Sequence, residues 1–302
     1  MKRNILLECS DVIKIYESQE SKIKVPALRG IDLTIHEGDL IAIIGPSGVG
    51  KTTLFNILGL LDRPSSGEII LNSQVLGRII YSRTPSDRFI TIRRQIFGFL
   101  FQLPDKNLLF HRNALENIIF PMKVIDKYAR EERIRRAHEL LRMLGLEKRK
   151  NHKPPQLSGG EAQRLGICVA LAIDPQIILA DEPTGELDSL NTMSIINYFR
   201  ELNNELGKTF IIVTHDPRFQ TMTDITYSML DGKITSLHKP KDEKESYQVR
   251  EEFTYVSNDG GLKIPNEYLR RYKISRIVIL EPAENGFKVI PVDEEEKKEN
   301  VP

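Results

Sequence analysis

Residues 45–52 combine glycines, a lysine and a threonine at the spacing G-x-x-x-x-G-K-[ST], which is typical of a phosphate-binding loop. Glycines let successive backbone N–H groups curl around phosphate oxygens without obstruction by side chains. Lys51 can reach the outer phosphates, and the hydroxyl of Thr52 can bind magnesium. The residues that we expect to bind a nucleotide here are Gly45, Pro46, Ser47, Gly48, Val49, Gly50, Lys51, Thr52 and Thr53.

The segments on either side supply the strand, loop and helix order that such a loop requires. Leu40 to Ile44 is an apolar run with the length of a buried strand, and residues 53–58 have helical spacing. The N-terminus of that helix would place a partial positive charge against the phosphates. A glycine-rich turn without a ligand is the alternative for the loop taken alone.

Two adjacent carboxylates follow a second apolar run, Ile177 to Ala180. Asp181 stands at the C-terminal edge of the predicted strand, where it can hold a magnesium shell beside Thr52. Glu182 is placed to orient or deprotonate the water that attacks a γ-phosphate. A strand-ending Asp-Glu-Pro turn is the structural alternative for both carboxylates.

A third segment contains Ser158, Gly159, Gly160 and Glu161. Two adjacent glycines would weaken the interior of a helix or strand, so they indicate a role other than packing within such an element. Ser158, with Glu161 three residues later, fits a capping box at a helix start. Such a helix start is also an anion site that can meet a γ-phosphate, and both interpretations can hold together.

In combination, these segments resemble the ATP-binding subunit of ABC transporters, and the resemblance runs from Ile5 to Leu237. It implies an α/β fold: a P-loop NTPase with an antiparallel β subdomain, a RecA-like core and a helical arm that carries Ser158. It also implies ATP and Mg²⁺ as cofactors and ATP hydrolysis as the activity. The hydrophobic pattern agrees, with short strands over residues 5–72, helices over residues 112–174, and strands near residues 177, 210, 225 and 233.

Four further residues match the family pattern. Tyr16 corresponds to the aromatic residue that stacks on adenine, and Gln102 to the glutamine that touches magnesium and the attacking water. Asp188 corresponds to the loop that communicates across a dimer, and His215 to the switch histidine at the γ-phosphate. Packing in a core or interface is the alternative for Tyr16. Capping of a helix that begins near Ser189 is the alternative for Asp188.

The resemblance therefore implies a catalytic set and a magnesium set. The catalytic residues would be Lys51, Gln102, Glu182 and His215, and the magnesium ligands would be Thr52, Gln102 and Asp181. Two residues depart from the family pattern. Glu186 stands where the family usually has a small or amide residue, and Val169 stands where it usually has an arginine. Neither departure removes a residue that would bind phosphate or magnesium, so we still expect ATP hydrolysis. The departures affect what can be expected of signalling across the dimer.

Within the superfamily, the segments 98–102, 107–109 and 114–118 with Pro121 resemble the branch of lipoprotein-release, macrolide-export and cell-division ATPases. The residues between Gln102 and Pro121 would shape a groove for a coupling helix of the membrane subunit. Ordinary core packing is the alternative for the apolar residues Leu108, Leu109, Phe110 and Ile119.

Composition is typical of a peripheral cytoplasmic subunit. The formal net charge is +1, so there is no global electrostatic reason to expect nucleic acid. No apolar run approaches the roughly 20 residues needed to cross a bilayer, and the first residues do not read as a secretion signal. Cys9 and Cys168 lack metal-ligand spacing and suit a reducing compartment. We expect a protein on the cytoplasmic face of the cell membrane.

The expected partners are a second copy of the chain and membrane-spanning permease subunits. Ser158 cannot easily reach the phosphates held by its own chain, so a head-to-tail homodimer with ATP at the interface is the expected active state. A soluble ABC ATPase that acts on nucleic acid or ribosomes is the alternative, but such proteins usually carry a second cassette, a long coiled coil or zinc-ligand cysteines. A non-hydrolysing tether is disfavoured by Gln102, Glu182 and His215.

Beyond residue 238 the composition changes. We expect an ATPase domain over residues 1–238, a charged linker over 239–252, a small β-rich module over 253–292 and an acidic tail over 293–302. Glu284-Asn285-Gly286 between two apolar runs predicts a hairpin. The module resembles the AbrB-type swapped-hairpin domain, which implies a dimeriser; DNA binding is the alternative, against which the acidic tail argues.

Overall fold

The computed structural model describes residues 4–17, 23–185, 187–240, 250–254, 264, 266–272, 274, 278–283 and 286–291. The chain divides into two compact units, Met1–Phe253 and Thr254–Pro302. Glu186, Glu284, Asn285 and the acidic tail, each interpreted above from the sequence, lie outside the described residues.

The strands of the larger unit are β1 (Ile5–Glu17), β2 (Lys24–His36), β3 (Leu40–Ile44), β4 (Ser66–Ser73), β5 (Gly77–Ile80), β6 (Phe97–Leu100), β7 (Ile177–Asp181), β8 (Thr209–Thr214), β9 (Ile225–Leu230), β10 (Lys233–Pro240) and β11 (Arg250–Thr254). Its α-helices are α1 (Lys51–Leu58), α2 (Ser86–Ile96), α3 (Pro104–Asn107), α4 (Ala114–Val124), α5 (Arg130–Met143), α6 (Gly159–Leu171) and α7 (Ser189–Leu206). The predicted helical stretch over residues 112–174 and the strands near residues 177, 210, 225 and 233 are confirmed.

An antiparallel sheet in the order β2-β1-β4-β5 forms the first layer of the larger unit. The sequence pattern predicted short strands here, whereas β1 and β2 each extend over 13 residues. Register shifts along β1, among them one between Cys9 and Val12, interrupt the alternation of inward and outward side chains. A continuous strand therefore reads as several short ones in the sequence.

A seven-stranded sheet in the order β11-β10-β9-β3-β8-β7-β6 forms the second layer. Strands β9, β3, β8, β7 and β6 run parallel, and β3, β7 and β8 are buried almost throughout. Burial on both faces explains why these strands read as unbroken apolar runs. Their carboxyl ends lie at one edge, which is where ligands bind in open parallel sheets. The predicted catalytic residues Lys51, Gln102, Glu182 and His215 follow β3, β6, β7 and β8, respectively.

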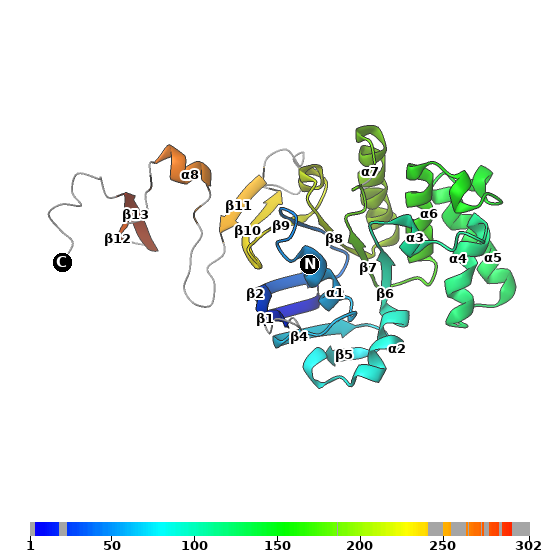
Figure 1. Ribbon diagram of the computed structural model, residues 1–302, viewed down its shortest axis with the longest axis horizontal. Coiled ribbons are helices and arrows are strands. Elements are labelled where there is room, and N and C mark those ends of the chain that lie inside the picture. The colour runs from blue at the N-terminus through cyan, green and yellow to red at the C-terminus, as the bar shows by residue number, and fades with distance from the viewer. Residues whose placement is uncertain are drawn as a thin grey trace. The chain divides into compact units, whose positions relative to one another are not determined.

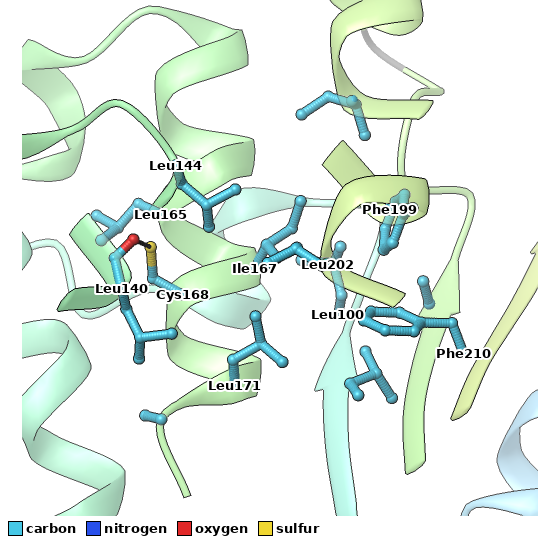
Figure 2. Packing of buried hydrophobic residues seen from close by; sticks show 14 of the residues in the cluster. Leu100, Leu140, Leu144, Leu165, Ile167, Cys168, Leu171, Phe199, Leu202 and Phe210 are labelled. Carbon is cyan, nitrogen blue, oxygen red and sulfur yellow. Dashed lines mark hydrogen bonds between the residues drawn. The ribbon is translucent and has the colours of Figure 1, made fainter. Parts of the chain in front are cut away.

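Helices cover both faces of the parallel sheet. Phe99 of β6 meets Phe55 of α1 edge to face, with ring centroids 6.0 Å apart. The next residue, Leu100, faces the opposite way and joins the core beneath α6 and α7. Figure 2 shows this core, where Phe199 of α7 packs against Phe210 of β8.

Helices α4, α5 and α6 pack together as the helical arm expected from the family resemblance (Figure 1). Cys168 is fully buried in this arm, and its thiol donates to the Leu140 carbonyl oxygen at 3.4 Å (Figure 2). Arg136 of α5 donates to the carbonyl oxygens of Leu171 and Ala172 at the end of α6. That contact satisfies carbonyl groups that a helix end leaves without an internal partner.

The structure differs from the expected linker at both ends, since residues 239–240 belong to β10. Residues 250–252 were assigned to the linker, but they belong to β11, which lies beside β10 in the seven-stranded sheet. An edge strand presents unpaired backbone groups, and β11 covers those of β10. The sequence did not predict this strand because three of the five residues of β11 are charged, and glutamate in particular has a low β-propensity.

The smaller unit contains α8 (Asn266–Arg271) and a two-stranded sheet of β12 (Val278–Ala283) and β13 (Gly286–Pro291). The strands pair antiparallel from Val278 opposite Pro291 to Ala283 opposite Gly286, so the predicted hairpin is confirmed. Ile279, Leu280 and Phe287 on these strands are at least half exposed.

Candidate functional site

The loop between β3 and α1 has the backbone that the glycine spacing predicts. Gly50 caps α1 with φ +104°, and a Cβ there would lie 2.4 Å from the Ala27 carbonyl oxygen. Glycine is therefore required at position 50 by the fold itself. Gly48 has φ +81°, and a Cβ there would meet nothing within 4 Å. Position 48 thus combines a left-handed backbone with open space in front of it, which suits an approaching phosphate.

Lys51 connects this loop to the end of β7. Its side chain is buried, and Nζ donates to the carbonyl oxygens of Gly45 at 2.8 Å and Pro46 at 3.0 Å. The same Nζ lies 3.3 Å from Oε1 of Glu182. The cation predicted to meet the phosphates and the carboxylate predicted to activate water are thus direct neighbours.

Glu182 is held from several directions. Its Oε2 accepts hydrogen bonds from the Thr214 hydroxyl at 3.0 Å and from the His215 backbone N–H at 3.1 Å, and it lies 2.9 Å from Nδ1 of the His215 ring. The backbone of Glu182 is left-handed at φ +47°, and its N–H donates to the Val213 carbonyl oxygen at 2.8 Å. A non-glycine residue in this conformation is strained, which is common where a side chain has to be aimed for a function.

Asp181 and Thr52 come together as the sequence predicted. The Thr52 hydroxyl donates to Oδ1 of Asp181 at 3.3 Å. Burial raises the pKa of the Asp181 carboxyl and Glu182 raises it further, although the hydrogen bond from Thr52 lowers it. Two adjacent oxygen ligands, one of them a buried carboxylate, form a donor set that fits a hard divalent cation such as Mg²⁺. Among the described residues, no group of three or more His, Cys, Asp or Glu side chains has the arrangement of a separate metal centre.

Gln102 lies beside the loop that follows Glu182. A Cβ added to Gly185 would be 3.1 Å from Nε2 of Gln102 and 3.5 Å from the Glu182 carbonyl oxygen. The Gln102 side chain therefore lies against the backbone of the loop that carries Glu182. The structure brings Lys51, Thr52, Asp181, Glu182, His215 and Gln102 to the same edge of the sheet.

The start of α6 is a capping box, as predicted. The Glu161 backbone N–H donates to Ser158 Oγ at 3.2 Å, and the Ser158 N–H donates to Oε2 of Glu161 at 2.9 Å. Arg149 donates to Oε1 of Glu161 at 2.8 Å. This hydrogen bond and the one from Ser158 hold the pKa of the Glu161 carboxyl below its ordinary value. Glu161 therefore remains ionised and stabilises the positive end of the helix.

This helix start contacts the first turn of α7 and the loop before it. A Cβ on Gly160 would lie 2.7 Å from Oδ1 of Asn191, and one on Gly159 would lie 3.5 Å from Leu187. Asp188 caps α7 by accepting from the Asn191 N–H at 2.9 Å, so the helix-capping interpretation of Asp188 is confirmed. Within one chain, Ser158 thus lies with the α7 loop, and Figure 1 shows α6 in the helical arm, apart from α1.

Tyr16 is 42% exposed, so it is not a core residue. Its hydroxyl donates to Oδ2 of Asp62 at 2.9 Å, while Lys14 donates to Oδ1 of the same carboxylate at 2.8 Å. Burial and the Asp62 contact raise the pKa of the Tyr16 hydroxyl, and a hydrogen bond with Thr53 lowers it. The Lys14 ammonium also lies 4.8 Å from the centroid of the Tyr16 ring. One face of the ring therefore carries a cation, and the other is the better platform for a base.

Sequence reasoning missed two residues of the site, Thr214 and Asp62. Thr214 stands between an apolar strand and His215, where a strand-end hydroxyl in a parallel sheet could have been noticed. Asp62 follows the loop after α1, and nothing in its sequence spacing indicates a contact with Tyr16, 46 residues earlier.

Comparison with known proteins agrees with this geometry. A family model described as ABC transporter matches residues 28–185. The lipoprotein-releasing system ATP-binding protein LolD of Francisella tularensis is 39% identical over 231 residues, which cover 76% of this chain and 96% of that protein. An uncharacterized ABC transporter ATP-binding protein of Thermotoga maritima is 43% identical over 234 residues, which cover 78% of this chain and 95% of that protein.

Solved structures show the same fold. The dimeric structure of MJ0796, a bacterial ABC transporter cassette, superposes with a TM-score of 0.69 and 40% identity, covering 78% of this chain and all of that one. A second dimeric MJ0796 structure, in a post-hydrolysis state with ADP and Pi, has a TM-score of 0.69 and 39% identity. The comparisons give the AbrB-type resemblance of the C-terminal segment no support. The chain has the ABC cassette fold, and it belongs to the family of ATP-binding, ATP-hydrolysing subunits of ABC transporters.

Proposed function

We propose that this chain energises a membrane transporter by Mg²⁺-dependent ATP hydrolysis at sites shared between two copies of the chain. The observation that supports this most strongly is the meeting of Lys51, Glu182 and His215 within hydrogen-bond or ion-pair distance at the carboxyl ends of the parallel strands. The three follow different strands, β3, β7 and β8, so the contact depends on the folded sheet. The runner-up, a soluble ATPase acting on nucleic acid or ribosomes, has no comparable support.

The site residues have distinct proposed roles. Backbone N–H groups of residues 45–52 and the α1 N-terminus bind the phosphates, and Lys51 neutralises the outer ones. Magnesium held by Thr52, Asp181 and Gln102 would supply charge neutralisation at the β- and γ-phosphates. Tyr16 stacks on adenine with the ring face opposite Lys14.

Glu182 acts as the general base. It accepts a proton from water as the water oxygen bonds to the γ-phosphorus and the bond from the γ-phosphorus to the bridging oxygen of ADP breaks. Thr214 and His215 keep the carboxylate oriented for this transfer. His215 also supplies a ring nitrogen beside the γ-phosphate; its side chain is 57% exposed and therefore accessible to the nucleotide.

The second copy completes each site. Ser158, Gly159 and Gly160 belong to a capped helix start that is ready to bind an anion, and in their own chain they lie with Leu187 and Asn191. A head-to-tail homodimer would place this helix start against the γ-phosphate bound by the partner. The dimeric cassette among the structural neighbours supports this arrangement.

The remaining partners are membrane-spanning permease subunits, which this chain would bind from the cytoplasmic face of the membrane. Within the described part of the chain, no helix combines the length and hydropathy needed to span a bilayer. The LolD relatives are named for lipoprotein release, which favours export or mechanical signalling for this chain. The transported molecule would be selected by the permease.

The partner can be identified by trapping. A tagged Glu182→Gln protein with ATP and Mg²⁺, incubated with detergent-solubilised membranes from the native cell, is expected to retain a polytopic membrane protein in fixed stoichiometry. The Lys51→Met protein should release that partner, because it cannot be locked by ATP. Recovery of only soluble protein or nucleic acid with the Glu182→Gln variant would contradict the transporter proposal.

We also propose that the C-terminal unit is a dimeriser. A two-stranded sheet is marginal alone in water, and Ile279, Leu280 and Phe287 on β12 and β13 are at least half exposed. Deletion of residues 255–302, which keeps β10 and β11 in their sheet, is expected to leave kcat for ATP unchanged and to reduce dimerisation in the absence of nucleotide, as measured by analytical ultracentrifugation. A shortened chain with the same nucleotide-free association constant as the full chain would remove this role.

A further inference from the structure

The backbone around Gln102 lies where the sheet stops providing hydrogen bonds. Strand β6 pairs with β7 only as far as Leu100 opposite Ala180. Phe101 and Leu103 flank Gln102 beyond that point and before the short helix α3. Backbone groups in this position need other partners if the glutamine is to keep a defined place.

The side chain of Asn107 provides these partners. Its Oδ1 accepts from the Phe101 N–H at 2.8 Å, and its Nδ2 donates to the Phe101 carbonyl oxygen at 2.7 Å and to the Leu103 carbonyl oxygen at 3.1 Å. One amide thus holds the backbone on both sides of Gln102. Only an amide can do this, because the contacts require one acceptor and two donor hydrogens together.

Asn107 also contacts the helix that begins with the Ser158 segment. A Cβ on Gly166 of α6 would lie 2.8 Å from Cδ1 of Leu100 and 3.6 Å from Cβ of Asn107. The absence of a side chain at Gly166 therefore lets α6 approach both β6 and Asn107 closely. The amide that holds the Gln102 loop is packed against the helix expected to bind the partner's nucleotide.

We infer that Asn107 is a positioning residue for ATP hydrolysis. It fixes Gln102 relative to Glu182 and holds the Gln102 loop in place against α6. The inference rests on the proposed role of Gln102 in binding magnesium and the attacking water. Because Asn107 acts through Gln102, its loss affects turnover and leaves the phosphate loop intact.

Asn117 offers a matched control. It is 2% exposed, and its amide makes the same kind of contacts with the backbone of residues 109–113. Its Oδ1 accepts from the Leu109 N–H, and its Nδ2 donates to the carbonyl oxygens of Leu109, Arg112 and Asn113. Removal of either amide leaves backbone groups unsatisfied, so both alanine variants should lose comparable thermal stability. Only Asn107 holds the loop that contains Gln102.

The test compares Asn107→Ala, Asn107→Asp, Asn117→Ala and Gln102→Ala in the full-length protein, with kcat, KM for ATP, the Mg²⁺ concentration for half-maximal activity, and the melting temperature as readouts. Asn107→Ala is expected to lower kcat by about tenfold or more, since small displacements of a positioned group have effects of this size or larger. Its KM for ATP should stay within about threefold of the parent value, and its Mg²⁺ requirement should rise. Asn117→Ala should keep kcat within about twofold.

Asn107→Asp covers the case in which the alanine variant does not fold. Its carboxylate can still accept from the Phe101 N–H, but it faces two carbonyl oxygens without a donor, so kcat should fall as in the alanine variant. Equal losses of kcat in Asn107→Ala and Asn117→Ala, or an unchanged kcat in the folded Asn107 variants, would overturn the inference. If Gln102→Ala keeps its kcat, the proposed role of Gln102 fails; if Gln102→Ala loses it and the Asn107 variants do not, only the role of Asn107 fails.

Discussion

Replacement of Glu182 with glutamine is expected to lower kcat for ATP by about 10²–10⁴-fold, the usual contribution of a general base, while ATP binding is retained. Glutamine keeps the size of the side chain and an oxygen that can accept from Thr214 and from the His215 backbone N–H. It cannot accept the proton of the attacking water. It also removes the negative charge beside Lys51, which leaves that ammonium group available to the phosphates.

Single-turnover hydrolysis and equilibrium ATP binding measure the two halves of this expectation separately. Glu116→Gln is a suitable control, because Glu116 closes the capping box of α4 with Asn113 and glutamine serves there equally well. The control should hydrolyse ATP at the parent rate. A Glu182→Gln protein with more than a tenth of parental kcat would show that another group accepts the proton.

Replacement of Lys51 with methionine is expected to weaken ATP binding by about 10–150-fold, which corresponds to the 1.5–3 kcal/mol of a hydrogen bond to a charged group. Methionine fills the same buried position but cannot bind phosphate. It also removes the two hydrogen bonds to the carbonyl oxygens of Gly45 and Pro46 and leaves Glu182 without its cation. The loop itself is thus expected to lose order as well as charge.

Isothermal titration with ATP and Mg²⁺ measures this loss. Lys208→Met is the matched control: Lys208 is also partly buried and forms an ion pair with Asp174 at 3.1 Å, but it precedes β8 at the other end of the strand. The control should bind ATP with the parental dissociation constant. Parental affinity in Lys51→Met would mean that the backbone N–H groups alone hold the nucleotide.

The sequence was sufficient for the fold of residues 5–238 and for the residues that meet at the sheet edge, because both follow from local signals. Buried parallel strands read as apolar runs, and a ligand site in such a sheet follows the strand ends, so Lys51, Asp181 and Glu182 could be assigned from motif and position. The role of His215 came from the family resemblance. The capping role of Ser158 was equally local, since its partner Glu161 is three residues away.

What escaped prediction depends on contacts between distant segments. The Tyr16 hydroxyl meets Asp62 across 46 residues that no short pattern connects, and Thr214 meets Glu182 across 32 residues, at the ends of two neighbouring strands. Strand β11 was missed because its pairing with β10 spans residues 241–249 and its own residues are mostly charged. Asn107 was noticed only as part of a family pattern; its hydrogen bonds to Phe101 and Leu103 become visible once α3 is folded.

The most direct test of the shared site is the mass in solution of residues 1–254 carrying Glu182→Gln, which keep β11 in its sheet, measured by light scattering with and without ATP and Mg²⁺. Removal of the C-terminal unit excludes dimerisation through β12 and β13. The same protein with Ser158→Asp serves as the comparison, because aspartate caps a helix as well as serine does but places a negative charge where the partner's γ-phosphate would bind. We predict that ATP doubles the mass of the first protein and leaves the Ser158→Asp protein monomeric. A monomer at saturating ATP in the first protein, or an ATP-dependent dimer in both, would contradict a site completed by Ser158 of a second copy.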